Sequence, residues 1–146
     1  MNNKEKVKYI LNNFRKAKAK GRNLVESSKK EYSLQAKVSV RGGRQPGRSD
    51  SEQEKYISKK EENKEKGESL IELSESIDFS VKSLPQRKRI IIRLKYFEEL
   101  TEKEIGKIEK INRTPRQVRR IEEDALELLA EYGLQMIYQQ LEKLLS

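Results

Sequence analysis

Residue types that build many common functional sites are missing from this chain. None of the 146 residues is cysteine, which excludes disulfide frameworks and zinc sites held by thiolates. Histidine is also missing, and it is the side chain that most often moves protons in catalysis and binds transition metals. We therefore expect no metal or other cofactor, no small-molecule substrate and no enzymatic activity.

Long apolar segments are missing as well. No run of about 18 apolar residues occurs, and the first residues lack the apolar core and cleavage site of a signal peptide. Proline occurs only three times, and almost no segment shows the alternating pattern of a strand. The sequence thus predicts an all-α, cytoplasmic protein that does not interact with a membrane.

What the chain has in excess is positive charge. Lys and Arg number 33 against 24 Asp and Glu, which gives a net charge of +9. The surplus lies in two blocks: residues 1–48 have 14 basic and 3 acidic side chains, and residues 81–121 have 13 and 5. Solvated helix faces would explain either block alone. Two such blocks favour a polyanionic partner, and we expect double-stranded DNA.

The N-terminal region, residues 1–35, is basic and has the spacing of helices. Apolar residues recur at three- and four-residue intervals, which predicts one helix over residues 3–20 that ends at Gly21. A second helix over residues 23–35 could pair with the first as a helical hairpin. Residues 36–51 contain three glycines, one proline and three arginines, and we expect a linker there.

Residues 52–82 are predicted to form one long central helix, with Gly67 as a point of interruption. Its second half has one apolar stripe, which core packing or a homodimer seam would bury: Leu70, Leu73, Ile77 and Val81. The C-terminal segment, residues 133–146, has the pattern of an amphipathic helix that must also be covered. It could pack on the N-terminal helix, on residues 70–81 or on a second copy of the chain.

Between these helices, residues 83–132 contain three helix-start signals in a row. They are Ser83 with Pro85 and Gln86, Thr101 with Glu104, and Thr114 with Pro115 and Gln117. In each, the hydroxyl can accept a hydrogen bond from the amide three residues on, and the Glu or Gln can accept one from the cap's own amide. Proline fits the first turn, where no amide is needed. The last two signals, with Asn112 between them, are typical of a helix-turn-helix.

The helix that begins at Thr114 has the two faces that a DNA-reading helix needs. One stripe is expected to face the core: Val118, Ile121, Ala125, Leu128 and Tyr132. Arg116, Arg120 and Glu123 lie nearly opposite this stripe. The first turns of such a helix enter the major groove, where Arg can fork to guanine and Gln to adenine. A plain three-helix bundle with solvated arginines is the alternative.

We expect DNA contacts from eight residues. Those toward the groove are Thr114, Arg116, Gln117 and Arg120, those on phosphates are Arg113 and Arg119, and those that add backbone attraction are Arg87 and Lys88. Phosphate contacts would supply most of the affinity and a steep salt dependence. The acidic run at residues 122–124 restricts the contact to the first two turns, because phosphates repel carboxylates. Arg119 and Arg120 could instead pair with Glu123 or Asp124 along the helix.

The order of motifs over residues 84–129 resembles the promoter-reading domain, region 4, of sigma-70 family factors. The matching residues are Leu84, Pro85, Ile91, Leu94, Tyr96, Phe97, Leu100, Thr101, Glu104, Ile105, Thr114, Val118, Arg119, Arg120, Ile121, Ala125, Leu126 and Leu129. One departure is that Thr114 follows Ile105 at a greater distance than in that pattern. A second departure is Gly106, which lies where that pattern favours alanine. In a helix interior, glycine costs about 1 kcal/mol relative to alanine.

The layout as a whole is similar to phage-encoded transcription regulators of the ArpU/RinA type. Residues 14–18 and the Gly/Pro/Arg linker carry this likeness. It implies a DNA-binding activator of phage or late genes in the cytoplasm of a bacterial cell or phage-infected host, with RNA polymerase as a partner to be tested. Two other classes stay open: a DNA-packaging adaptor like a small terminase subunit, and a helical protein-interaction module that touches no DNA.

Overall fold

The computed structural model describes the backbone of residues 1–41 and 50–146, and the side chains of residues 1–29 and 59–146. The helical elements follow in this order: α1 (Asn3–Asn12), α2 (Phe14–Arg41), α3 (Asp50–Lys82), α4 (Gln86–Ile92), the π-helical turn η1 (Arg93–Phe97), α5 (Glu102–Lys107), α6 (Pro115–Glu131), the 3₁₀ turn η2 (Leu134–Ile137) and α7 (Tyr138–Leu145). The described residues contain no strand. The predicted all-α fold is confirmed, including the N-terminal helix pair, the long central helix and the terminal helix.

The break between the first two helices lies at Asn13, and not at Gly21 as predicted. The Asn13 side chain donates a hydrogen bond to the carbonyl of Tyr9 (2.8 Å), which completes the end of α1. Gly21 lies inside α2 and is buried, because the backbone of α3 comes close to it there. Tertiary contact thus offsets the low helix propensity of glycine.

The predicted linker over residues 36–51 differs from the structure at both of its ends. Helix α2 continues to Arg41, and α3 begins at Asp50. Every glycine and proline of the predicted linker lies between residues 42 and 47, so the segment up to Arg41 has no residue that would stop a helix. Residues 42–49 lie outside the part of the chain that the structure describes.

The chain divides into two compact units, and one of them comprises residues 18–72, with most of α2 and α3. The two helices touch at Gly21 and Gly67, so Gly67 does not interrupt α3. A Cβ atom at Gly67 would lie 2.8 Å from the Gly21 carbonyl oxygen, and one at Gly21 would lie 2.9 Å from the Gly67 carbonyl oxygen. Any larger residue would hold the two backbones apart, so the glycines permit this close crossing.

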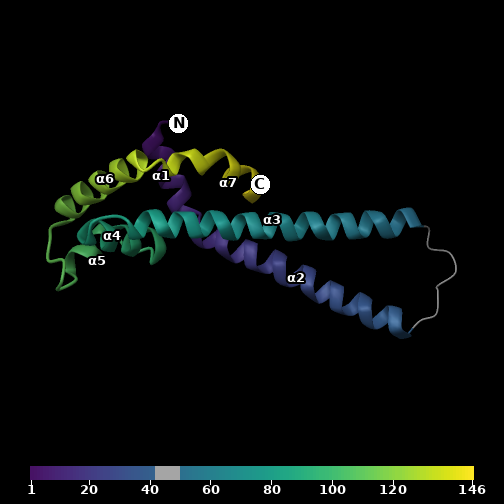
Figure 1. Cartoon of the computed structure of the whole chain (residues 1–146). Helices are drawn as coiled ribbons and strands as arrows, with labels where there is room; N and C mark the ends of the chain where they lie inside the picture. The colour runs from purple at the N-terminus through teal and green to yellow at the C-terminus, as the bar shows by residue number, and fades with distance from the viewer. Residues whose placement is uncertain (42–49) are drawn as a thin grey trace. The chain divides into compact units, whose positions relative to one another are not determined.

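The other unit comprises residues 1–17 and 73–146 and contains the helix-turn-helix. Helix α6 packs against α4, α5 and α1, with α5 near the start of α6 and α1 near its end (Figure 1). The core between α4, α5 and α6 is built from fully buried and flanking partly buried side chains, namely Ile91, Ile105 and Val118 with Leu94, Leu100, Ile111 and Ile121.

The C-terminal segment packs on α1, which is one of the three places considered from the sequence. The rings of Tyr9 and Tyr138 meet edge to face with centroids 5.0 Å apart, and Leu134 and Leu141 are buried. The stripe on the central helix is covered as well, since Leu70, Leu73, Ile77 and Val81 are all buried. Core packing within the chain therefore accounts for both stripes.

The first of the three predicted helix-start signals is wrong. The Ser83 hydroxyl donates a hydrogen bond back to the carbonyl of Phe79 (2.9 Å), in the last turn of α3. Helix α4 begins at Gln86 with Pro85 as its cap residue and has no side-chain cap bond. Ser83 follows α3 directly, so a carbonyl of that helix is within its reach and competes with the amides of α4.

Candidate nucleic-acid interface

Helices α5 and α6 both begin at a threonine cap, as predicted. The Thr101 hydroxyl accepts a hydrogen bond from the amide of Glu104 (3.2 Å). At α6, the Thr114 hydroxyl accepts from the amide of Gln117 (3.2 Å), and the Gln117 side chain accepts from the amide of Thr114 (3.0 Å). Pro115 occupies the first helical position. This complete capping box fixes the start of α6, which carries most of the predicted DNA contacts.

The turn between α5 and α6 folds back onto α5 at Gly106. The Arg113 amide donates a hydrogen bond to the Gly106 carbonyl (3.2 Å), and a Cβ atom at Gly106 would lie only 2.3 Å from the Arg113 carbonyl oxygen. Asn112 has a φ of 43°, the left-handed conformation that asparagine tolerates. The two departures from the sigma pattern are therefore connected. The longer turn between Ile105 and Thr114 packs directly on the backbone of α5, and the glycine at position 106 leaves room for it.

The predicted groove-facing residues lie together at the N-terminal end of α6. All four are exposed: Thr114, Arg116, Gln117 and Arg120. Arg113, just before them, is exposed too. None of these three arginines has an ion pair within the part of the chain that the structure describes. Arg87 and Lys88 lie on the first turn of another helix, α4, where Arg87 is exposed and Lys88 is half-buried.

The buried face of α6 is wider than the predicted stripe, but it does not include Tyr132, the last residue of that stripe. Val118 and Ala125 are buried as expected, but Tyr132 is 46% exposed, and its hydroxyl donates to the carbonyl of Ser83 (3.3 Å). Leu126 and Leu129 are buried instead. Because α6 packs against three helices, its buried surface extends to both sides of a single stripe.

Arg119 pairs with a carboxylate that the sequence did not suggest. Its guanidinium donates to Glu102, at the start of α5, through Nε (3.2 Å to Oε2) and Nη2 (3.0 Å to the same oxygen). The predicted alternative partners were Glu123 and Asp124 on its own helix. The hydrogen bond from Arg119 holds the pKa of the Glu102 carboxyl below its ordinary value, with a smaller contribution from Lys95.

Glu102 belongs to a longer chain of charged groups that ends in the core. The Lys95 ammonium, from η1, donates to Glu102 (3.0 Å) and to the buried Glu122 of α6 (2.5 Å). Glu122 also accepts from the Tyr96 hydroxyl (2.6 Å). Burial works against the charged ammonium of Lys95, but its two carboxylate partners outweigh that effect and raise its pKa. Burial, together with the bond to Glu122, raises the pKa of Tyr96.

The sequence contains a signal for this network in the position of Glu122. Glu122 falls four residues after Val118 and three before Ala125, so it lies on the buried side of α6. A carboxylate in that position requires a donor from another helix, because a buried charge without a partner is costly. The identity of the donors, Lys95 and Tyr96, could not be predicted from spacing, since they lie 27 and 26 residues away.

The three consecutive acidic residues of α6, at positions 122–124, differ in their exposure and in their ion pairs. Glu122 is turned into the core, with 4% of its side chain exposed, and is paired there. The Glu123 carboxylate lies 3.9 Å from the Lys4 ammonium of α1. Asp124 is exposed. Of these three carboxylates, only those of Glu123 and Asp124 are exposed to repel a phosphate, and the restriction of DNA contacts to the first turns of α6 stays a prediction.

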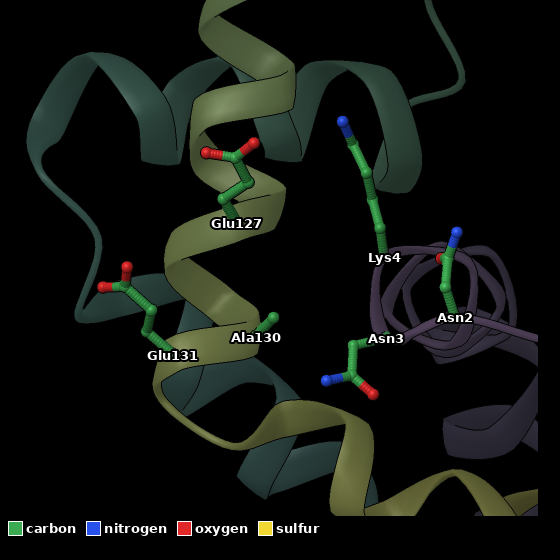
Figure 2. A pocket seen from close by; sticks show the side chains of 6 residues that line it. All are labelled: Asn2, Asn3, Lys4, Glu127, Ala130 and Glu131. Atoms are coloured by element: carbon green, nitrogen blue, oxygen red, sulfur yellow. The ribbon is translucent and has the colours of Figure 1, made fainter.

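An open pocket of about 450 Å³ lies at the C-terminal end of α6, away from the exposed arginines at its N-terminal end. The first turn of α1 and the last turns of α6 line it, through Asn2, Asn3, Lys4, Glu127, Ala130 and Glu131 (Figure 2).

Within the described residues, no group of three or more acidic side chains could hold a metal ion. No helix in the described part of the chain is long and apolar enough to span a membrane.

The comparisons with known proteins agree with the geometry of the helix-turn-helix. Residues 81–131, about a third of the chain, match the family described as Sigma-70, region 4. The matched segment covers α4, η1, α5 and α6. No curated protein and no solved structure matches the chain. Residues 81–131 are therefore a sigma-70 region 4 domain, a non-catalytic helix-turn-helix module of the kind that binds DNA in transcription.

Proposed function

We propose that this protein is a sequence-specific, DNA-binding regulator of transcription that places the start of α6 in the major groove. The observation that carries the proposal is the cationic end of this helix. Arg113, Arg116 and Arg120 are exposed there without an ion pair in the described residues, while the other side of α6 packs in the core. The capping box presents this end in a fixed conformation, and its amides add partial positive charge.

Each predicted contact residue has a role in this proposal. Thr114, Arg116, Gln117 and Arg120 face the bases, where bidentate Arg and Gln contacts discriminate sequence. Arg113 and Arg119 bind phosphates on either side. Arg87 and Lys88 add backbone attraction from the start of α4, and the net charge of +9 supports the salt-dependent part of the affinity.

A finer proposal follows from the likeness to ArpU/RinA-type regulators. We propose that the protein activates phage or late genes in the cytoplasm of a bacterial cell or phage-infected host, and that it contacts RNA polymerase. A homodimer would let two copies of α6 read two half-sites. The support is the likeness of residues 14–18, together with the region 4 domain itself. A transcription assay with purified bacterial polymerase on the selected site, with and without the protein, tests the activator role.

Selection of bound fragments from a random duplex pool tests DNA binding and identifies the site at once. A palindromic consensus would indicate a symmetric dimer. On the selected site, Arg120→Ala should cost about 1–3 kcal/mol and relax one base preference if it contacts a base edge. Lys143→Ala removes the same charge from an exposed position on α7 and serves as the matched control. Absence of any enriched site, with binding that does not respond to salt, would overturn the proposal.

The two other classes give different results in the same experiments. A DNA-packaging adaptor would assemble into a ring, which light scattering would detect as a mass many times that of the 17.2 kDa chain. A helical interaction module would give neither an enriched site nor a shift on duplex DNA. A monomer or dimer with an enriched site supports the regulator.

A further inference from the structure

The ion pair between Arg119 and Glu102 can affect DNA binding in two opposite ways. A carboxylate beside a phosphate-binding arginine repels the phosphate, so electrostatics alone predicts that DNA binding improves when Glu102 is neutralised. The geometry indicates the opposite. The Arg119 side chain is 65% exposed, whereas 19% of the Glu102 side chain is exposed, so the carboxylate lies beneath the guanidinium.

The contact is directed to one edge of the guanidinium. Glu102 accepts from Nε and Nη2 of Arg119, and Nη1 makes no hydrogen bond within the described residues. An edge-on pair of this type fixes the plane of the guanidinium. The two Nη1 hydrogens are left to donate to an acceptor outside the protein.

Glu102 is itself held in place from the core. Lys95 bridges it to Glu122, which is buried and also bonded to Tyr96. The chain of contacts therefore runs from the interior of the domain to the exposed Arg119. The two carboxylates balance the charges of Lys95 and Arg119, so the network as a whole adds no net attraction for DNA.

We propose that Glu102 is a positioning residue for DNA binding, which holds Arg119 so that its Nη1 group donates to a backbone phosphate. This inference rests on the proposed function, since it presupposes that α6 binds duplex DNA. It differs from a purely structural role, because it predicts that Glu102 acts on affinity through Arg119 alone.

The test is a set of equilibrium titrations of labelled duplex, carrying the selected site, with wild type and variants of the full chain. Glu102→Gln should weaken binding by about threefold to tenfold although it makes the protein more positive. The matched control is Glu109→Gln, at an exposed carboxylate in the turn before α6 with no ion pair in the described residues. It should bind as tightly as wild type or slightly tighter.

A double-mutant cycle separates positioning from damage to the fold. Arg119→Ala should weaken binding and lower the salt slope by about 1. In the Arg119→Ala background, Glu102→Gln should cause no further loss, because the residue through which it acts is gone. Equal losses in both backgrounds, or tighter binding by Glu102→Gln than by wild type, would overturn the inference.

A second variant keeps the test decisive if Glu102→Gln is unfolded at the assay temperature, as circular dichroism would reveal. Arg119→Lys retains the charge and leaves Glu102 in place but cannot form the edge-on pair. It should bind more weakly than wild type by about the same factor as expected for Glu102→Gln, and wild-type affinity would overturn the inference. A wild-type protein that binds no duplex would overturn the proposed function and this inference together, whereas binding by wild type with the wrong variant pattern overturns the inference alone.

Discussion

The carbonyl oxygen of Arg113 lies so close to Gly106 that a Cβ atom there would be 2.3 Å from it. The contact joins the end of the turn to the middle of α5, and the Arg113 amide donates back to the Gly106 carbonyl. The position of Arg113, one of the two predicted phosphate contacts, thus depends on the absence of a side chain in the preceding helix.

Gly106→Ala is expected to destabilise the protein, although alanine is the better helix former by about 1 kcal/mol. The new methyl group meets backbone, which cannot move aside as a flexible side chain would, so we expect a net loss of about 2 kcal/mol. Urea unfolding followed by circular dichroism measures it. Lys107→Ala, at the exposed neighbouring position of α5, is the control and should change stability by less than about 0.5 kcal/mol. An alanine variant as stable as wild type would show that the turn does not need this contact.

The buried carboxylate of Glu122 is expected to matter more than any other charge in the helix-turn-helix. Glu122→Ala leaves the Lys95 ammonium and the Tyr96 hydroxyl without the acceptor that they share. Removing one partner of a buried ion pair typically costs about 3 kcal/mol or more. Tyr96→Phe removes only one donor and should cost about 1–2 kcal/mol. Glu123→Ala, at the exposed next position, is the comparison for general effects of charge, and an equally large loss there would contradict a special role for Glu122.

Local signals were sufficient to predict the start of α6. The features that the sequence did not predict depend on contacts between different helices. Thr114, Pro115 and Gln117 act within one turn, so their spacing was sufficient. Ser83 has the same local pattern but bonds to the preceding helix, which spacing does not reveal. The partners of Glu122 and Arg119 come from other helices, and neither periodicity nor charge runs specify which residues meet there.

The ion pair between Glu102 and Arg119 gives the stability of the domain a defined dependence on acid. The folded protein lowers the pKa of Glu102, so the pair stabilises the fold above the ordinary carboxyl pKa and is lost as the pH falls through the lowered value. Wild type should therefore be more stable than Glu102→Gln near pH 7, and the difference should shrink as the pH falls below the ordinary carboxyl range.

Urea unfolding of both proteins across this pH range measures the difference directly. Glu109→Gln serves as the control for the general effect of removing one negative charge from a basic protein. A difference between wild type and Glu102→Gln that stays constant from neutral to acidic pH would show that the pair contributes nothing through its ionisation.

The close crossing of α2 and α3 makes a prediction for the unit formed by residues 18–72. Gly67→Ala would place a methyl group 2.8 Å from the Gly21 carbonyl oxygen and 2.9 Å from a Val25 methyl carbon. The helices must separate to admit it, so we expect a loss of about 1–3 kcal/mol despite the better helix propensity of alanine. Asn23→Ala, at an exposed position of α2, should be neutral or stabilising. Hydrogen exchange of the α2 and α3 amides measures the effect on this unit, and protection unchanged from wild type in Gly67→Ala would show that the crossing does not depend on glycine.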